Sequence, residues 1–165
     1  MIATRRGAGR VYLAFVLLLA LHFYLRPRVW DGRAAPDFLA LGLILFALRT
    51  RPGVAAIVGF LVGLLADSLT PARFGANALA HTVLAYTAAW GRAVFFPDNL
   101  LVNAGLFAAG IWVRNVLVML LSATPVSQLG PVLLVWAPLQ ALTTAVAGVI
   151  LVSVLRDWFA IRLEA

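Results

Sequence analysis

Apolar stretches alternate with short polar breaks along the chain, and this alternation predicts six helices. The apolar segments cover residues 11–25, 38–48, 53–69, 74–91, 99–122 and 131–155. Proline or glycine occurs in breaks such as RTRPG, TPAR, FFPDN and SQLGP, as is typical of helix ends. The pattern therefore predicts one all-α bundle over residues 1–165, without a second domain.

The second segment is short for a membrane helix. Its eleven apolar residues would span about 17 Å as a helix, against about 30 Å for the hydrocarbon core of a bilayer. It can cross if residues 34–51 are helical and the flanking arginines extend outward, or if the bilayer thins around it. A re-entrant hairpin is the alternative. We expect a crossing, because six passes place both chain ends on one side.

Composition indicates that lipid surrounds these helices. Of the 165 residues, 64% are hydrophobic and 12% are charged, whereas a soluble domain of this size needs a larger polar fraction to cover itself. We therefore expect an integral membrane protein. The absence of cysteine from the sequence excludes a disulfide framework, a thiolate metal site and a cysteine nucleophile.

The formal net charge of +7 reflects thirteen basic residues, all of them arginine, against six acidic residues. Eight lie in the two tails and in the second and fourth breaks, and four lie in the first and third breaks. This distribution between apolar segments indicates membrane anchoring and not nucleic-acid binding. Because the side richer in arginine usually faces the cytoplasm, both termini are expected there. The three arginines of the first break oppose this orientation.

A stripe of small residues on the third segment ends at a carboxylate. Gly59, Gly63 and Asp67 are spaced four apart, so they share one face of a helix. Small residues let helix backbones approach closely in lipid. We expect the two glycines to pack this helix against a neighbour in the same bundle, and a contact with another subunit is the alternative. Gly75, eight residues after Asp67, is also expected to serve helix packing.

Ionisable residues gather toward the leaflet opposite the cytoplasm in this topology. They are His22, Asp37, Asp67, His81 and Arg114. Such groups are costly in lipid unless they reach water, a partner or a helix end. Arg114 is the deepest, and it shares a helix face with Asn99 and Asn103, which indicates that it faces the bundle interior. It can pair with Asp67 or with Asp37, or extend to the outer headgroups, and the sequence leaves these alternatives open.

Patterns that carry enzyme chemistry are missing from the sequence. It contains no G-x-S-x-G, H-E-x-x-H or G-x-x-x-x-G-K-[ST] motif, and no serine has an adjacent base. His22 and His81 are too few for a metal site, and no spacing brings them together with the aspartates. We therefore expect polar packing or interface residues, and no enzyme, metal or cofactor.

Three features follow one another between residues 36 and 90: PDFLALGLILFAL, the basic turn RTRPG, and GFLVGLLAD followed by a nearby glycine. This order resembles the rod shape-determining protein MreD family of bacteria. The family's Pro-Asp start of the second helix, its G-F-x-x-G-x-x-x-D pattern and its later glycine match Pro36, Asp37, Gly59, Phe60, Gly63, Asp67 and Gly75. Arg114 has no counterpart in these motifs.

The resemblance implies a non-enzymatic scaffold subunit of the cell-elongation complex in the bacterial inner membrane, which supports peptidoglycan synthesis and cell shape. It implies a direct partner, MreC, and through it MreB, RodA and the elongation transpeptidase. The implied fold is similar to the substrate-binding subunits of energy-coupling-factor transporters. A small-molecule-binding subunit of such a transporter is therefore the alternative function.

The scaffold is favoured over the transporter subunit for two reasons. The breaks are too short to form an outer lid, and the first helix lacks a small-residue stripe for an energising partner. As a scaffold, the bundle would present an outward-facing groove rimmed by Asp37 and Asp67 to a partner's membrane helix or periplasmic segment.

Overall fold

The computed structural model describes residues 5–25, 28, 33–94, 99–122 and 125–154. Within these residues the chain is helical, with no strand, which confirms the expected all-α class. The elements are α1 (Arg5–Leu25), α2 (Phe38–Ala47), α3 (Pro52–Ser68), η1 (Pro71–Arg73), α4 (Ala76–Trp90), η2 (Gly91–Val94), α5 (Leu100–Leu121), α6 (Val126–Pro131), η3 (Val132–Trp136, a π-helical turn) and α7 (Ala137–Val154).

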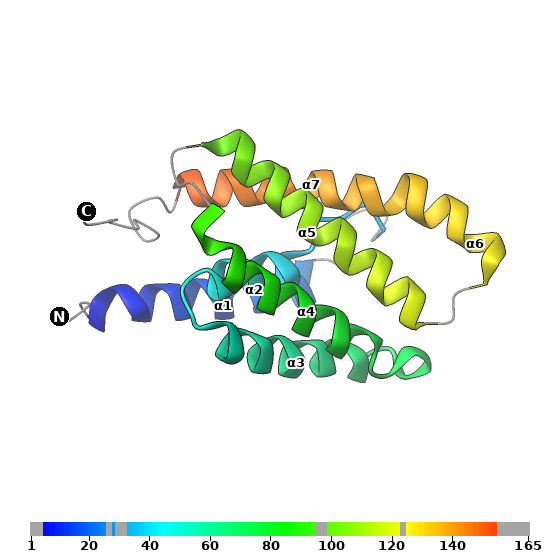
Figure 1. Cartoon of the computed structure of the whole chain (residues 1–165), viewed down its shortest axis with the longest axis horizontal. Helices are drawn as coiled ribbons and strands as arrows, with labels where there is room; N and C mark the ends of the chain where they lie inside the picture. Colours follow the sequence, from blue (N-terminus) through cyan, green and yellow to red (C-terminus); the bar gives the residue numbers. More distant parts are fainter. Residues whose placement is uncertain (1–4, 26–27, 29–32, 95–98, 123–124, 155–165) are drawn as a thin grey trace.

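Successive long helices run in opposite directions and lie side by side (Figure 1). α3 and α4 form a tight hairpin, α5 packs along α7, and α2 lies among α1, α3 and α4. The start of α1 and the end of α7 lie at the same end of the bundle. The connections after α2 and α4 are also at that end, which we call the basal end; the connections after α3 and α5 are at the other, distal end.

Two helical stretches are long and apolar enough to cross a membrane, judged by length and composition over the described residues. They are Leu100–Leu121, with 22 residues, and Ser127–Val154, with 28 residues. Three shorter helices are also apolar: Val11–Leu25, Phe38–Ala47 and Pro52–Ser68.

The short helix α2 corrects the expected helical range of 34–51. It begins at Phe38 because the Asp37 side chain accepts a hydrogen bond from the Ala40 N–H at 3.1 Å and so caps the helix. It ends at Ala47, after ten residues, and nine of these are buried. Because its neighbours enclose it, α2 does not itself have to match the thickness of the lipid.

Two other helix starts differ from the hydropathy pattern. α1 begins at Arg5 instead of residue 11, because arginine and alanine have high helix propensity, so the helix extends beyond the apolar run. The last helical stretch begins at Val126 instead of residue 131, so Pro131 lies inside it. Proline removes a backbone N–H from the helix interior, and the wide π-helical turn Val132–Trp136 follows directly.

The glycines of α3 allow its close approach to α4. A Cβ atom added at Gly63 would collide with the backbone of Asn77 and Ala78, and one added at Gly59 would lie 2.9 Å from the Ala85 Cβ. Both glycines are buried. They therefore face another helix of the same chain, where backbone contact replaces side-chain packing.

We predict that Gly63→Ala lowers the free energy of unfolding by about 1–3 kcal/mol, because the added methyl group forces α3 away from α4. Gly53→Ala, in the same helix, is the matched control, since an added Cβ there meets no atom within 4 Å. Denaturant unfolding of the purified protein in detergent measures both values. Equal effects of the two substitutions would contradict the close packing of α3 on α4.

Candidate functional site

A buried polar network occupies the distal half of the bundle. Every long helix contributes to it: α1 and α3 near their C-terminal ends, α2 and α4 near their N-terminal ends, α5 from its second half and α7 from its first half. Its members are His22, Asp37, Asp67, Asn77, His81, Arg114, Asn115, Gln140 and Thr144.

Asp37 is the centre of the polar network and is completely buried. Its Oδ2 lies 3.2 Å from Arg114 Nη1, and its Oδ1 lies 3.2 Å from His22 Nδ1. Its backbone N–H donates a hydrogen bond to Thr144 Oγ1 at 2.9 Å. One residue at the start of α2 therefore contacts α1, α5 and α7, which lie far apart in the sequence.

The role of His22 depends on which ring nitrogen carries a proton. Nδ1 lies 3.1 Å from the backbone nitrogen of Leu39 and 3.2 Å from Asp37 Oδ1. Without a proton, Nδ1 accepts the Leu39 N–H; with a proton, it donates to the Asp37 carboxylate. Either state holds the end of α1 against the start of α2.

Arg114 connects this centre to α4. Its Nη2 donates to Asn77 Oδ1 at 3.1 Å and lies 3.5 Å from His81 Nε2, while Nη1 donates to Asn115 Oδ1 at 2.8 Å. The Arg114 side chain is buried among these partners. Of the alternatives left open by the sequence, the structure therefore places the guanidinium against Asp37, and it does not reach the outer surface.

Asp67 is also completely buried, but its partners are the backbone amides at the start of α4. Its Oδ2 accepts the N–H groups of Gly75 and Ala78, both at 2.9 Å. Its Oδ1 accepts the backbone N–H of Asn77 at 3.1 Å and the side-chain amide at 3.0 Å. A carboxylate at the end of α3 thus satisfies the free N–H groups at the start of α4.

Gly75 supports this cap through its conformation, and the structure corrects the expectation that it packs against a helix. A Cβ added at Gly75 would meet no atom within 4 Å, whereas its φ of +94° lies in the left-handed region that favours glycine. The stretch from Gly59 to Gly75 is therefore one structural unit. Two glycines bring α3 onto α4, and Asp67 closes the connection between them.

Four members of the polar network were not identified from the sequence: Asn77, Asn115, Gln140 and Thr144. Asn115 Nδ2 donates to Gln140 Oε1 at 2.9 Å, and Gln140 Nε2 donates to the Ala35 carbonyl at 3.3 Å. A signal was present, because Asn77 and His81, and also Gln140 and Thr144, are polar pairs four residues apart in apolar helices. Such a pair lies on one helix face.

The expected partner groove rimmed by Asp37 and Asp67 requires correction. Both side chains have 0% exposure, because helix N-terminal amides and Arg114 surround their oxygen atoms. Neither carboxylate forms the rim of an open groove. Within the part of the chain that the structure describes, no group of three or more histidine or acidic side chains is arranged to hold a metal ion.

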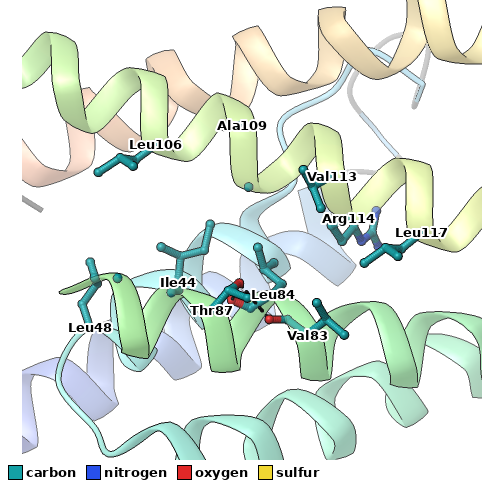
Figure 2. Close-up of a pocket in the computed structure, with 13 residues that line it drawn as sticks. Ile44, Leu48, Val83, Leu84, Thr87, Leu106, Ala109, Val113, Arg114 and Leu117 are labelled. Carbon is teal, nitrogen blue, oxygen red and sulfur yellow. Dashed lines mark hydrogen bonds between the residues drawn. The ribbon is translucent and has the colours of Figure 1, made fainter. Parts of the chain in front are cut away.

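An apolar cavity of about 340 Å³ lies between α2, α4 and α5 (Figure 2). Aliphatic side chains line most of it, including Ile44, Leu84 and Val113, and Arg114 lies at one end. The Thr87 hydroxyl on this wall donates to the Val83 carbonyl of its own helix at 2.8 Å. The cavity therefore suits an aliphatic chain or apolar side chains better than a polar solute.

The fold and the polar network define an all-α bundle whose buried charges join its own helices. The model of the rod shape-determining protein MreD family matches residues 6–160, so the chain belongs to the MreD family. This match extends from α1 to beyond α7, well past the motifs in residues 36–90. Neither the curated proteins nor the solved structures contain a match to the chain.

Membership gives the protein a role in the rod-shape complex and in cell shape. The family is one of shape-determining structural proteins and is not a known enzyme family. Together with the two long apolar helices, it indicates a membrane protein.

We predict that Asp37 and Arg114 are energetically coupled. Asp37→Asn or Arg114→Gln alone is expected to lower the free energy of unfolding by about 3 kcal/mol, because each leaves the opposite charge buried without its counter-charge. The double variant is expected to lose less than the sum of the two by about 1 kcal/mol or more. Unfolding in detergent provides the four values of the cycle.

The matched control is the cycle of Asp67→Asn with Arg114→Gln. These residues are joined through Asn77, so their coupling is expected to be the smaller of the two. Additive effects in the Asp37 cycle, or stronger coupling in the Asp67 cycle, would contradict the pairing.

Proposed function

We propose that this protein is a non-enzymatic scaffold subunit of the bacterial cell-elongation complex, which binds an MreC-like protein directly. Through that partner it would associate with MreB, RodA and the elongation transpeptidase, and so support peptidoglycan synthesis. The family match over residues 6–160 supports this role. The observation that carries the proposal is the use of the buried ionisable side chains, which bind helices of the bundle to one another.

The contacts of the polar network favour a scaffold over a catalyst or carrier. Asp37 and Arg114 form an ion pair with each other, and the Asp67 carboxylate accepts hydrogen bonds from backbone amides at the start of α4. These bonds hold the distal half of the bundle in one arrangement. A stable arrangement presents a constant surface to partner helices, which bind in lipid mainly by packing.

We further propose that the bundle crosses the inner membrane six times, with both termini in the cytoplasm. The arginines Arg49, Arg51 and Arg92 lie in connections at the basal end, where α1 starts and α7 ends. The positive-inside rule favours placing this end in the cytoplasm. The polar network would then lie toward the periplasm, where MreC-like partners could contact the bundle.

The transporter alternative gains no support from the family match, which concerns cell shape. The apolar character of the cavity between α2, α4 and α5 also disfavours a polar substrate there.

Copurification with a coexpressed MreC-like protein tests the scaffold proposal. We expect the tagged protein in mild detergent to retain this partner, and the Asp37→Asn variant to retain less of it, because loss of the ion pair loosens the bundle. Leu101→Ala is the control, since Leu101 is 86% exposed, and it should retain the partner as the unchanged protein does. Recovery of an ATP-binding transporter module instead, or no partner with well-folded protein, would contradict the proposal.

A further inference from the structure

A second cavity, of about 510 Å³, lies at the distal end between α5 and the stretch from α6 to α7. Arg33, from the connection before α2, and Arg73, from η1, both contribute to its lining. Asn115 and Gln140 supply polar groups from the adjoining edge of the polar network. The cavity therefore combines two cations from separate connections with amide groups held by the bundle.

The position of Arg33 is supported by an aromatic contact. Its guanidinium carbon lies 5.5 Å from the centre of the Trp136 ring, on the wide turn η3. A cation at this distance from an aromatic ring is attracted to its face. Trp136 also lines the cavity, so this contact keeps the Arg33 charge beside it.

Arg33 and Arg73 make the wall of this cavity basic, and none of the described residues that line it is acidic. Asp37 and Asp67 are both completely buried and are bound to Arg114 and to the amides of α4. Two arginines with donor geometry suited to phosphate thus adjoin a cavity with amide donors. Apolar side chains such as Val118 and Val132 form another part of the wall, and these suit the beginning of a hydrocarbon chain.

We propose that this distal cavity binds a phosphate-bearing anion, with Arg33 and Arg73 contacting the phosphate and Asn115 donating a further hydrogen bond. The ends of membrane helices lie at the level of lipid headgroups, so an anionic phospholipid is one source of this group. A soluble phosphate-bearing molecule is the other. The inference concerns ligand binding and does not depend on which protein partner the scaffold holds.

Native mass spectrometry of the full-length protein in detergent can test this site. The probes are dioleoyl phosphatidylglycerol, dioleoylglycerol, which has the same chains without phosphate, and inorganic phosphate. We expect the Arg33→Gln/Arg73→Gln double variant to bind phosphatidylglycerol about tenfold or more weakly, as each arginine near an anionic headgroup contributes about 1 kcal/mol.

The control is Arg51→Gln/Arg92→Gln, which removes the same charge from exposed arginines at the basal end. It is expected to bind phosphatidylglycerol as the unchanged protein does. Ser127→Trp keeps both arginines but places a large ring at the cavity wall, and it should also weaken binding. Because Ser127 is exposed, this substitution is expected to leave the fold intact.

The three probes separate the outcomes. Binding of phosphatidylglycerol that inorganic phosphate does not displace identifies a lipid headgroup as the ligand, whereas displacement by phosphate identifies a soluble source. Equal losses in the two arginine double variants would overturn the proposal, because binding would then follow net charge alone. Equal binding of dioleoylglycerol and phosphatidylglycerol would overturn it as well.

Discussion

The contact between Asp37 and Arg114 is the interaction on which the distal half of the bundle depends. A single charge in a helical membrane protein is strongly unfavourable, whereas two opposite charges at 3.2 Å reduce each other's cost. Asp37 also starts α2 and contacts His22 of α1 and Thr144 of α7, and Arg114 donates to Asn77 of α4. Removing either charge therefore affects contacts among five helices and not just one pair.

The α3–α4 hairpin solves a related problem with backbone groups. The first N–H groups of a helix lack partners within that helix, and in a membrane they find no water. The Asp67 carboxylate accepts hydrogen bonds from the backbone N–H groups of three residues at the start of α4. The glycines of α3 allow the close approach of the two helices that brings the carboxylate to these groups. This unit joins the polar network through Asn77, which binds both Asp67 and Arg114. The family motif around Gly59 to Gly75 thus has a folding role in this chain.

Hydropathy was sufficient to predict the all-helical class and the positions of α3, α4 and α5 to within about two residues, because long apolar runs have few other stable structures in lipid. The apolar run 38–48 also located α2, but the longer helical range of 34–51 assumed for a membrane crossing was wrong, because the Asp37 cap and burial among neighbours set the length of this helix. The ionisable residues could be assigned to one half of the bundle, since their positions in alternating helices follow from the topology. The sequence could not show whether Arg114 pairs with Asp37 or with Asp67, because the pairing depends on how the helices rotate and pack against one another.

Solid-state NMR of the protein in lipid bilayers tests the central contact most directly. Recoupling between ¹⁵N-labelled arginine side chains and ¹³C-labelled aspartate carboxyl groups reports pairs in direct contact. The structure predicts a strong signal that disappears in the Arg114→Gln variant, in keeping with the 3.2 Å separation of Arg114 Nη1 and Asp37 Oδ2. A signal between Arg114 and the Asp67 carboxyl group alone, or no signal between Arg114 and any aspartate, would contradict the account.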